Sequence, residues 1–467
     1  MLVVGLGRLG GGVGVTRWLI DQGAEVTVSD RATPQSLAES VRSIDHPGVT
    51  LHLGGHDLHD PATADLAVIN PAIDKARCEI FGEIVRRGIP WTTEINLFCE
   101  RCPAMVIGVT GTYGKSTTCA MLAHVLEATD DPQHAGSTVY LGGNIGRSLL
   151  GDLKRMKRSD VVILELSHRQ LEDVPRIGWV PSLAVITNLS PHHLDDYPNV
   201  DHYYTAKLNI AADSKKANRV VVGELDEQAR AIFERIVPAK SGRVRSVQPL
   251  DPPVILNVPG RHNQGNAACV LEVCAYLSRD RVGVREALRS FAGLPHRLEH
   301  VRILGGVDYY NDSKSTSPTA TITAVHAFDR PVVAIVGGQD KGVSLTACAQ
   351  VLAHRCRAVI CTGQSSAKLA GAVHEARQAP ASAASGSASP CASNHSPIRP
   401  TDRDREDESL QSLAIREAAT LEEAVRLAGA QARKGDVILF TPGAPSFDTY
   451  ANFAQRGDHF INIVNSL

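Results

Sequence analysis

The sequence predicts an α/β protein of three domains, with a Rossmann-like domain at each end and a phosphate-loop (P-loop) domain between them. Three observations support this prediction. Apolar strand-like runs alternate with helical stretches along most of the chain, which is typical of parallel sheets built from βαβ units. Two glycine-rich loops each follow such a run and precede a helical stretch. The length of 467 residues is about three times the roughly 150 residues of an average domain.

The strands are expected where Val, Leu, Ile and Ala cluster, because aromatic residues make up only 4% of the chain. Strands of a parallel sheet that is covered by helices on both faces need such continuous aliphatic runs. The clearest runs are residues 2–4, 26–29, 66–69, 105–109, 161–164, 183–187, 219–222, 307–310, 332–336, 358–361 and 437–440.

Two breaks in this alternation indicate domain boundaries. A short polar stretch near residues 98–103 precedes a new strand, and a Gly-Leu-Pro-His-Arg segment that ends at Arg297 interrupts a helical stretch. We therefore expect three domains, at residues 1–98, 99–294 and 295–467.

Residues 378–409 do not fit a packed domain. The segment is rich in Ala, Ser and Pro and then in charged residues, so it cannot bury enough apolar surface to offset the entropy of ordering. We expect a flexible surface insertion within the last domain, and its role stays open.

Composition and charge exclude several classes of protein. Lys+Arg 48 against Asp+Glu 50 gives a net charge of -2, so there is no global basic field to hold nucleic acid or an anionic membrane. No apolar run approaches the roughly 20 residues of a membrane-spanning helix. Ten scattered cysteines are typical of a reduced, cytoplasmic protein, and the Cys99–Cys102 pair reads as a helix end. The chain opens without a signal peptide and enters a strand almost at once, so a few further residues upstream of Met1 are expected.

The first glycine-rich loop contains Gly5, Gly7 and Gly10, and Asp30 follows Gly10 by 20 residues at the end of the next expected strand. These residue types and spacings match the dinucleotide-binding fingerprint, in which glycines let a phosphate approach the N–H groups of a helix. Three interpretations stay open at this point: an NAD site, a tight turn that needs glycine, and a loop for another diphosphate such as that of a UDP-sugar.

The second glycine-rich motif runs from Gly108 to Thr117 and contains Gly114-Lys115-Ser116 between an expected strand and helix. These residues are the end of a P-loop, although Val109 stands where the strict motif has its first glycine. Backbone N–H groups surround phosphate, the lysine bridges the outer phosphates and the hydroxyl reaches Mg²⁺. A nucleoside triphosphate site is therefore expected. Glu165 ends a nearby expected strand and is a natural Mg²⁺ ligand, although such a residue alone is commonly solvated.

Further polar clusters stand where expected strands give way to loops. His192-His193 suggests zinc, but no HExxH motif or cysteine partner accompanies the pair. His262 and Asn263 are expected to precede an Ala-rich helix that carries Asn266 in its first turn. The last domain has four such clusters, at residues 295–297, 311–316, 337–342 and 445–457. Each alone is explained by turn or capping chemistry, but together they mark the ligand edge of open α/β sheets.

Taken together and in this order, the motifs resemble the Mur ligases, ATP-dependent amide-forming enzymes of peptidoglycan synthesis. The resemblance covers the chain except residues 378–409. Residues 311–316, 337–342 and 446–456 look like the branch of the family that adds D-glutamate to UDP-N-acetylmuramoyl-L-alanine. The resemblance implies a cytoplasmic, monomeric enzyme that uses ATP and two Mg²⁺ ions. It also implies that domain closure assembles the site, and that the substrate carboxylate is first converted to an acyl phosphate.

The resemblance also implies a role for individual residues. Lys115, His193 and Lys207 would be catalytic, and Lys207 would be carbamylated. The metal ligands would be Ser116, Glu165, His193 and Lys207. The UDP-substrate would contact Arg8, Leu9, Asp30, Arg31 and Asn144. ATP would contact Gly111, Thr112, Tyr113, Gly114, Lys115, Ser116, Thr117, Asn263, Asn266, Arg297 and Asp312. D-glutamate would contact Thr316, Lys341, Ser446 and Phe453.

The chain departs from the family pattern at several positions. Tyr113 stands where the P-loop usually has Asn, and His192 stands where an acidic residue usually precedes the histidine. His168-Arg169 replaces a small and an apolar residue, and Ser317 replaces an Asn. The expected catalytic positions are retained, so activity is still expected, whereas rate and affinity stay open.

Three alternatives remain on sequence grounds. One is a Mur-type ligase for another amino acid, or a folylpolyglutamate-synthetase-like enzyme. The second is an NAD-dependent dehydrogenase, which the first glycine-rich loop alone would favour. The third is a nucleotide-binding scaffold in which the departures have abolished turnover.

Overall fold

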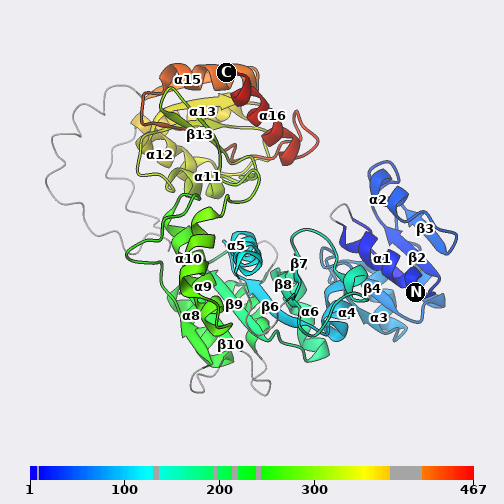
Figure 1. The fold of residues 1–467 in the computed structure, drawn as a ribbon. Helices are drawn as coiled ribbons and strands as arrows, with labels where there is room; N and C mark the ends of the chain where they lie inside the picture. Colours follow the sequence, from blue (N-terminus) through cyan, green and yellow to red (C-terminus); the bar gives the residue numbers. More distant parts are fainter. Residues whose placement is uncertain (8–9, 130–135, 193–196, 213–218, 238–242, 379–412) are drawn as a thin grey trace. The chain divides into compact units, whose positions relative to one another are not determined.

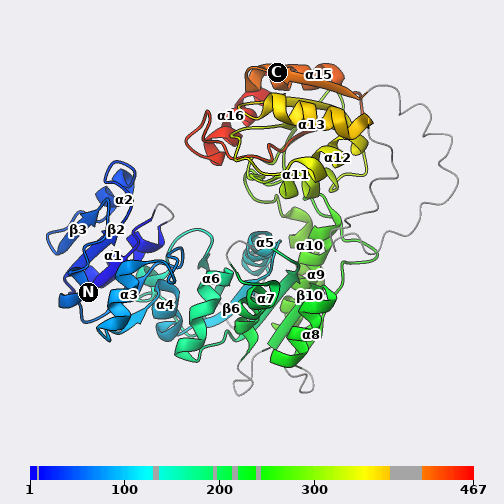
Figure 2. The same ribbon diagram turned by 180° about the vertical axis from the view of Figure 1, so that it is seen from behind.

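The computed structural model describes residues 1–7, 10–129, 136–192, 197–212, 219–237, 243–378 and 413–467. The chain divides into two compact units, each of which is described by itself. The first unit is Met1–Pro253 with Gly265–Leu288, and the second is Val254–Gln264 with Arg289–Leu467. Figures 1 and 2 show three sheets with helices packed against them, two in the first unit and one in the second. The predicted α/β class with parallel sheets is confirmed.

The first sheet has the strand order β3-β2-β1-β4-β5, and all its pairings are parallel. The strand β1 lies between β2 and β4, so the glycine-rich loop that follows β1 opens where the strand order reverses, the usual ligand position in such sheets. The strands are β1 (Leu2–Val4), β2 (Val26–Asp30), β3 (Val49–Leu53), β4 (Ala67–Ile69) and β5 (Trp91–Thr92). The helices are α1 (Gly11–Asp21), α2 (Ala38–Ser43), η1 (Asp60–Thr63), α3 (Glu79–Arg86) and α4 (Glu94–Arg101).

The central sheet has the order β11-β10-β9-β6-β8-β7 and is also parallel throughout. Strand β6, which leads into the P-loop, lies between β8 and β9, so the carboxyl ends of all three strands meet at the P-loop. The strands are β6 (Met105–Thr110), β7 (Val139–Gly143), β8 (Val161–Glu165), β9 (Leu183–Leu189), β10 (Arg219–Leu225) and β11 (Val244–Ser246). The helices are α5 (Lys115–Ala128), η2 (Leu150–Asp152), α6 (His168–Asp173), η3 (Val174–Ile177), α7 (Val200–Leu208), η4 (Asn209–Ala211), α8 (Glu227–Ile236), α9 (Arg261–Tyr276) and α10 (Arg281–Ser290).

The first and central sheets share one hydrophobic core. Val3 of β1, Phe98 of α4 and Val106 of β6 belong to the same cluster of buried side chains. Gly14 of α1 also approaches Ser148 of the central region so closely that a Cβ on Gly14 would lie 2.3 Å from the Cβ of Ser148. This shared core explains why the two sheets form one compact unit.

The sheet of the second unit has the order β12-β13-β17-β14-β15-β16, with β12 antiparallel to β13 and the other pairings parallel. Two hydrophobic clusters cover its two faces. The strands are β12 (Glu299–Leu304), β13 (Val307–Asn311), β14 (Val332–Val336), β15 (Cys356–Thr362), β16 (Ala414–Ala418) and β17 (Val437–Phe440). The helices are α11 (Pro318–Val325), α12 (Thr346–Arg355), α13 (Ser366–Gln378), α15 (Leu421–Gln431) and α16 (Phe453–Ser466).

All eleven strands that the aliphatic runs predict are present. The helix end expected at the Cys99–Cys102 pair is also confirmed, because α4 ends at Arg101 and Cys102 is its C-cap. The domain boundaries at 98/99 and 294/295 stay predictions. The expected insertion lies outside the described residues, except for Gln378 at the end of α13. Among the described residues, none of the helices has the length and apolarity needed to cross a bilayer.

Two glycines of the first unit give opposite predictions for stability. A Cβ on Gly223 of β10 would lie 2.0 Å from the carbonyl oxygen of Thr187 in the neighbouring strand, whereas a Cβ on exposed Gly82 of α3 would meet no atom within 4 Å. Gly223→Ala should therefore lower the free energy of unfolding by about 1 to 3 kcal/mol. Gly82→Ala should raise it by up to about 1 kcal/mol, because alanine favours a helix. Both changes are measured as shifts in the urea midpoint of unfolding, which is followed by pulsed hydrogen exchange of peptides from β9. Equal midpoints for the two variants would contradict the packing argument.

Candidate active site

The P-loop connects β6 to α5, and its conformation requires glycine at two positions. Gly111 has φ +151° and Gly114 has φ +79°, values that other residues adopt only with strain. A Cβ on Gly111 would lie 2.0 Å from the hydroxyl oxygen of Thr187. The loop is therefore pressed against the end of β9.

The end of β9 holds the P-loop through a set of short hydrogen bonds. The Tyr113 N–H donates to the side-chain oxygen of Asn188 at 3.0 Å, and the Tyr113 carbonyl accepts from Thr187 Oγ1 at 2.5 Å and from Asn188 Nδ2 at 3.0 Å. The Ser190 N–H donates to Thr112 Oγ1 at 3.1 Å. These contacts hold the backbone of residues 112–113 against the end of β9.

Two lysines meet at one carbonyl of the loop. Lys115 Nζ donates to the carbonyl oxygens of Gly111 and Thr112, both at 3.0 Å, and Lys207 Nζ donates to the same Gly111 carbonyl at 2.7 Å. Lys115 is the first residue of α5, whereas Lys207 lies near the end of α7. Two predicted catalytic residues, 92 positions apart in the chain, are thus brought to one atom.

Lys207 occupies an unusual environment for a lysine. Its side chain is 1% exposed and lies over the ring of Tyr203, with 5.1 Å between Nζ and the ring centroid. Burial lowers the pKa of Lys207 well below its usual range, the positive charge of Lys115 lowers it further, and the carboxylate of Glu165 opposes the shift. The amine is therefore readily neutral, which makes its nitrogen a competent nucleophile.

Glu165 ends β8 and is 2% exposed, so it is not the solvated surface residue that a glutamate at a strand end commonly is. Its Oε1 accepts a hydrogen bond from Asn144 Nδ2 at 2.8 Å. Its Oε2 is buried and has no hydrogen-bond partner among the described residues. An unpaired carboxylate oxygen inside a protein is costly, and a cation is the ligand that would stabilise it. Asn144, which was expected at the UDP-substrate, thus also contacts the expected metal ligand.

Asn266 lies directly against the P-loop. A Cβ on Gly114 would lie 2.3 Å from Asn266 Oδ1, so the expected ATP residue and the loop are in contact. The expected start of its helix was wrong, because α9 begins at Arg261. His262 and Asn263 therefore lie in the first turn and Asn266 in the second. The segment before them, from Pro259 to Gly260, turns at a glycine with φ +101°, which the sequence pattern did not reveal.

The second unit gathers the other expected ATP residues. Asp312 follows β13, is 3% exposed, and accepts hydrogen bonds from the Leu298 N–H at 3.1 Å and from Thr441 Oγ1 at 3.2 Å. Burial raises the pKa of Asp312 to about 6, and the charge of Arg297 opposes this shift. Burial, and then the same Arg297, lower the pKa of His262 to about 4. Arg297 is thus within electrostatic reach of both groups. The Asn263 side chain donates to the Pro259 carbonyl at 2.7 Å.

Two of the four expected acceptor residues line a cavity of about 230 Å³ in the second unit. Thr316 and Lys341 line it together with Pro445, and Ser446 is the next residue in the chain. Ser446 and Phe453 are not among the described residues that line this cavity. Ser446 is 2% exposed, and Phe453 begins α16. The structure therefore brings together two of the four predicted residues at one cavity.

Arg456 of α16 was not assigned a role by sequence reasoning, although it is an organising residue of this region. It is 3% exposed and donates to the Ser313 carbonyl at 2.9 Å and to the Ala444 carbonyl at 3.0 Å. It thereby connects the loop after β13 to the loop after β17. Sequence reasoning also missed the hydrogen bonds by which Thr187 and Asn188 hold the P-loop, which we call the Thr187–Asn188 clasp. These contacts depend on β6 and β9 being neighbours in space.

The glycine-rich loop of the first sheet is held by the residue that the fingerprint predicts. Asp30 ends β2, and its Oδ2 accepts the Gly7 N–H at 3.1 Å while Oδ1 accepts the Ala32 N–H at 2.8 Å. Gly12 of α1 completes the packing, because a Cβ there would lie 2.2 Å from the Leu6 carbonyl. Arg31 is exposed. Arg8, Leu9 and His193 lie outside the described residues.

The departures from the family pattern have specific partners in the structure. The rings of Tyr113 and His192 form an edge-to-face pair with 5.5 Å between centroids. His168 is 7% exposed and packs edge-to-face against Tyr203 at 5.6 Å. Arg169 donates to the Ala72 carbonyl, on the loop after β4, at 3.2 Å. The rings of Tyr113, His192 and His168 therefore pack beside the P-loop, to which Tyr203 is hydrogen-bonded at Thr112 Oγ1. Arg169 instead contacts the loop after β4.

Three α/β sheets, a P-loop held by the neighbouring strand, and two lysines with a buried glutamate at that loop define a P-loop nucleotide-dependent enzyme. Comparison with family models narrows this class. Residues 1–92 match the MurD-like N-terminal domain of Mur ligases, residues 109–247 the Mur ligase middle domain, and residues 296–443 the Mur ligase glutamate ligase domain. The chain belongs to the Mur ligase family.

Curated relatives match over the whole chain. The UDP-N-acetylmuramoylalanine–D-glutamate ligase of Symbiobacterium thermophilum is 33% identical, with 100% of this chain and 97% of the relative covered. The enzyme of the same name from Desulfatibacillum aliphaticivorans is 29% identical, with 100% and 98% covered. Among solved structures, the UDP-N-acetylmuramate–alanine ligase of Thermotoga maritima has a TM-score of 0.58 at 19% identity, with 100% of this chain and 99% of that chain covered. This structural likeness concerns the fold alone.

The Tyr113–His192 pair gives a prediction about nucleotide binding. Tyr113→Ala and His192→Ala should each weaken binding of a non-hydrolysable ATP analogue by about 2- to 10-fold, because the ring pair supports the loop that receives phosphate. The double variant should be little worse than either single one. Tyr113→Phe, which keeps the ring, should bind like the parent. Calorimetric titration of the parent, the two single alanine variants and the double variant forms a double-mutant cycle, and Tyr113→Phe is titrated in the same way. Strictly additive losses would show that the rings act independently.

Proposed function

We propose that this chain adds D-glutamate to UDP-N-acetylmuramoyl-L-alanine at the expense of ATP, a step of peptidoglycan precursor synthesis, as a monomer in the cytoplasm. The observation that carries the proposal is the convergence of Lys115, Lys207 and the buried Glu165 at the P-loop. The full-length similarity to curated enzymes of that name supplies the substrates.

The chemistry needs two transfers. The carboxylate of the alanyl residue attacks the γ-phosphorus of ATP, and the bond to the ADP oxygen breaks to give an acyl phosphate. The amine of D-glutamate then attacks the acyl carbon, and the tetrahedral intermediate expels phosphate as the amide forms. Negative charge builds on phosphoryl oxygens in the first transfer, and Lys115 at the head of α5 can stabilise it.

The residues at the P-loop fit a magnesium ion. Oxygen ligands of the kind that Mg²⁺ prefers come from the Ser116 hydroxyl and from Glu165 Oε2, which is buried without a hydrogen-bond partner among the described residues. When bound, Mg²⁺ neutralises charge on the phosphate oxygens of ATP. A second ion would use Glu165, His193 and a modified Lys207, as the family resemblance implies.

A carbamate on Lys207 would remove the repulsion between the charged forms of Lys207 and Lys115. An ammonium cannot ligate a metal and repels the neighbouring Lys115. The nitrogen of a neutral amine can attack CO₂ and lose a proton, which gives an N-carboxylate. This change replaces a buried cation by an anion that can bind a metal through oxygen. The low pKa of Lys207 favours the reaction, because it increases the neutral fraction.

This proposal predicts opposite behaviour for the two lysines on the Gly111 carbonyl. Lys207→Ala should lose activity by more than about 100-fold and recover in part with formate or acetate, which can occupy the position of a lost carboxylate. Lys115→Ala should be equally impaired but should not respond to these anions, because a cation has been removed. Steady-state phosphate release measures both. Near-normal rates for Lys207→Ala, or equal responses of the two variants to formate, would contradict the carbamate.

The acceptor assignment gives a second prediction. Lys341 lines the cavity of the second unit and is proposed to bind an acceptor carboxylate, together with Thr316, Ser446 and Phe453. Lys341→Ala should raise KM for D-glutamate more than about tenfold and change KM for ATP little, because a charged hydrogen bond to one substrate is lost. Lys434→Ala is the matched control, since Lys434 is exposed and is not among the described residues that line the cavity. Equal effects on both substrates, or equal effects of the two variants, would count against this assignment.

The remaining assignments concern the UDP-substrate and ATP. Asp30, Arg31 and Asn144, with Arg8 and Leu9, are proposed to bind the UDP-substrate. Asn266, Asn263, Arg297 and Asp312 are proposed to bind ATP together with the P-loop residues.

An acceptor panel tests the function itself. The purified chain is incubated with ATP, Mg²⁺ and UDP-N-acetylmuramoyl-L-alanine, and the product mass is read for D-glutamate, L-glutamate and other amino acids. We expect a product only, or at least 100-fold faster, with D-glutamate. Product with a different amino acid or with a folate substrate would favour another amide ligase. NADH binding in place of ATP-dependent product would favour a dehydrogenase.

A further inference from the structure

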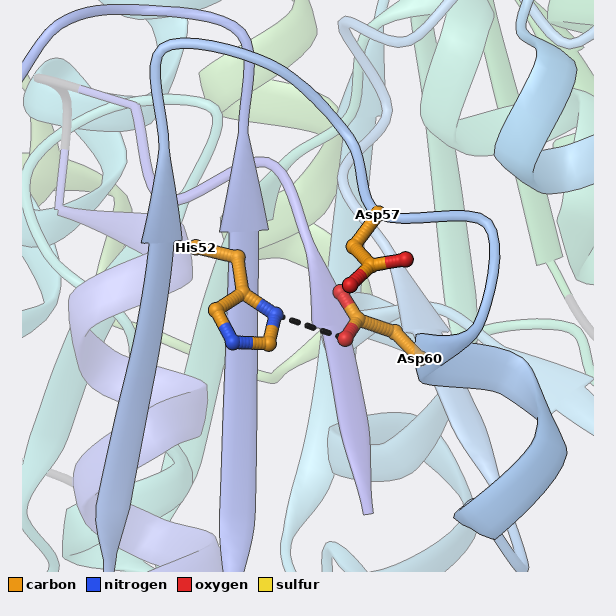
Figure 3. A group of neighbouring side chains, drawn as sticks. All are labelled: His52, Asp57 and Asp60. Atoms are coloured by element: carbon orange, nitrogen blue, oxygen red, sulfur yellow. Dashed lines mark hydrogen bonds and ion pairs between the residues drawn. The ribbon is translucent and has the colours of Figure 1, made fainter.

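A second cluster of metal-ligating side chains lies in the first sheet, on the edge strand β3 and the loop that follows it. His52 belongs to β3, Asp57 lies on the loop, and Asp60 is the first residue of η1 (Figure 3). His52 Nδ1 and Asp60 Oδ1 are 2.6 Å apart. One ligand atom from each of the three side chains lies within 4.8 Å of the others. This spacing is small enough for one ion to contact all three.

Asp60 provides the second observation. Its side chain is only 5% exposed, and its Oδ2 is buried without a hydrogen-bond partner among the described residues. Figure 3 shows the carboxylates of Asp57 and Asp60 pointing toward one another. In the part of the chain that the structure describes, His52 is the only basic side chain within ion-pair distance of Asp60, and none lies within that distance of Asp57. Two facing carboxylates, of which only Asp60 is paired with an imidazole, carry more negative charge than this one pair can neutralise.

We propose that His52, Asp57 and Asp60 bind a divalent transition-metal cation of the Zn²⁺ type. An imidazole nitrogen with two carboxylates suits Zn²⁺ or Mn²⁺, whereas Mg²⁺ and Ca²⁺ favour oxygen ligands alone. His52 is 38% exposed and Asp57 is exposed, so water can complete the coordination from the open side. The Asp57 Oδ1 already accepts the His59 N–H at 2.8 Å, which orients this carboxylate in the manner of an outer-shell hydrogen bond.

The cation would act on the loop between β3 and η1, which is hydrogen-bonded to Asp30. The N–H groups of Gly54 and Gly55 both donate to the Asp30 carbonyl, at 3.0 and 3.3 Å, and the Asp30 carboxylate in turn holds the Gly7 N–H. An ion that ties β3 to η1 therefore stiffens the segment next to the glycine-rich loop. Metal binding at this cluster does not depend on the function proposed above.

A purely structural role is the competing explanation. The His52–Asp60 pair could connect β3 to η1 by its hydrogen bond alone. In that case His52→Ala would destabilise the sheet in metal-free buffer, and zinc would make no difference to any variant.

Zinc binding to the full-length chain separates the two explanations. Binding is measured by equilibrium dialysis with metal analysis, in excess Mg²⁺ to cover the P-loop. Asp57→Ala is the main variant, because Asp57 is exposed and its loss should not prevent folding. His52→Ala is the second variant, and His59→Ala is the matched control on the same loop, exposed and outside the cluster.

The proposal predicts that the parent and His59→Ala bind one more equivalent of zinc than Asp57→Ala and His52→Ala, or bind it more than about tenfold tighter. Cobalt substitution should give the parent a visible d–d absorption band that His52→Ala loses. Equal stoichiometry and affinity in all four proteins would overturn the proposal. A loss of stability in His52→Ala without any change in zinc binding would overturn it as well, in favour of the ion pair alone.

Discussion

The P-loop region depends on one carbonyl group. The Gly111 oxygen accepts hydrogen bonds from both Lys115 and Lys207, so two amines converge on a neutral acceptor. Lys207 is buried there, and burial together with Lys115 disfavours its charged form. Two adjacent ammonium groups in such a place are stable only if one is neutral or modified, or if anions join them. The triphosphate and carboxylate groups of the proposed substrates are anions of that kind.

The surrounding structure keeps this carbonyl in position. Gly111 can adopt its positive φ only as glycine, and the end of β9 closes the remaining space through Thr187 and Asn188. The buried Glu165 lies on the other neighbouring strand, β8. The P-loop follows β6, its supporting residues lie at the end of β9, and Glu165 ends β8. All of them lie at the same edge of the sheet, because the carboxyl ends of parallel strands coincide. Tyr113 and His192, which depart from the family pattern, pack against each other at this edge.

Much of the fold could be predicted from the sequence, since buried parallel strands are continuous aliphatic runs. The strands that were missed are short or lie at or next to an edge of their sheet, such as β5 with two residues and β12 with alternating exposure. The P-loop and Asp30 were predictable because glycine spacing and strand-end position reflect local geometry. The Thr187–Asn188 clasp, the burial of Lys207 and the bridging role of Arg456 were not, because they depend on which strands become neighbours in space. The start of α9 was misplaced because Asn263, a favoured N-cap residue, was placed before the helix, whereas α9 begins directly after Gly260.

The central claim is that a substrate carboxylate is phosphorylated at the Gly111–Lys115–Lys207 site before the amide forms. The direct measurement uses UDP-N-acetylmuramoyl-L-alanine with ¹⁸O in both carboxylate oxygens of the alanyl residue. Turnover with ATP, Mg²⁺ and D-glutamate should release phosphate that carries one ¹⁸O atom per product molecule and leave the other in the new amide. Unlabelled phosphate released alongside the amide product would contradict the account, because the acyl oxygen would then never have been bonded to phosphorus.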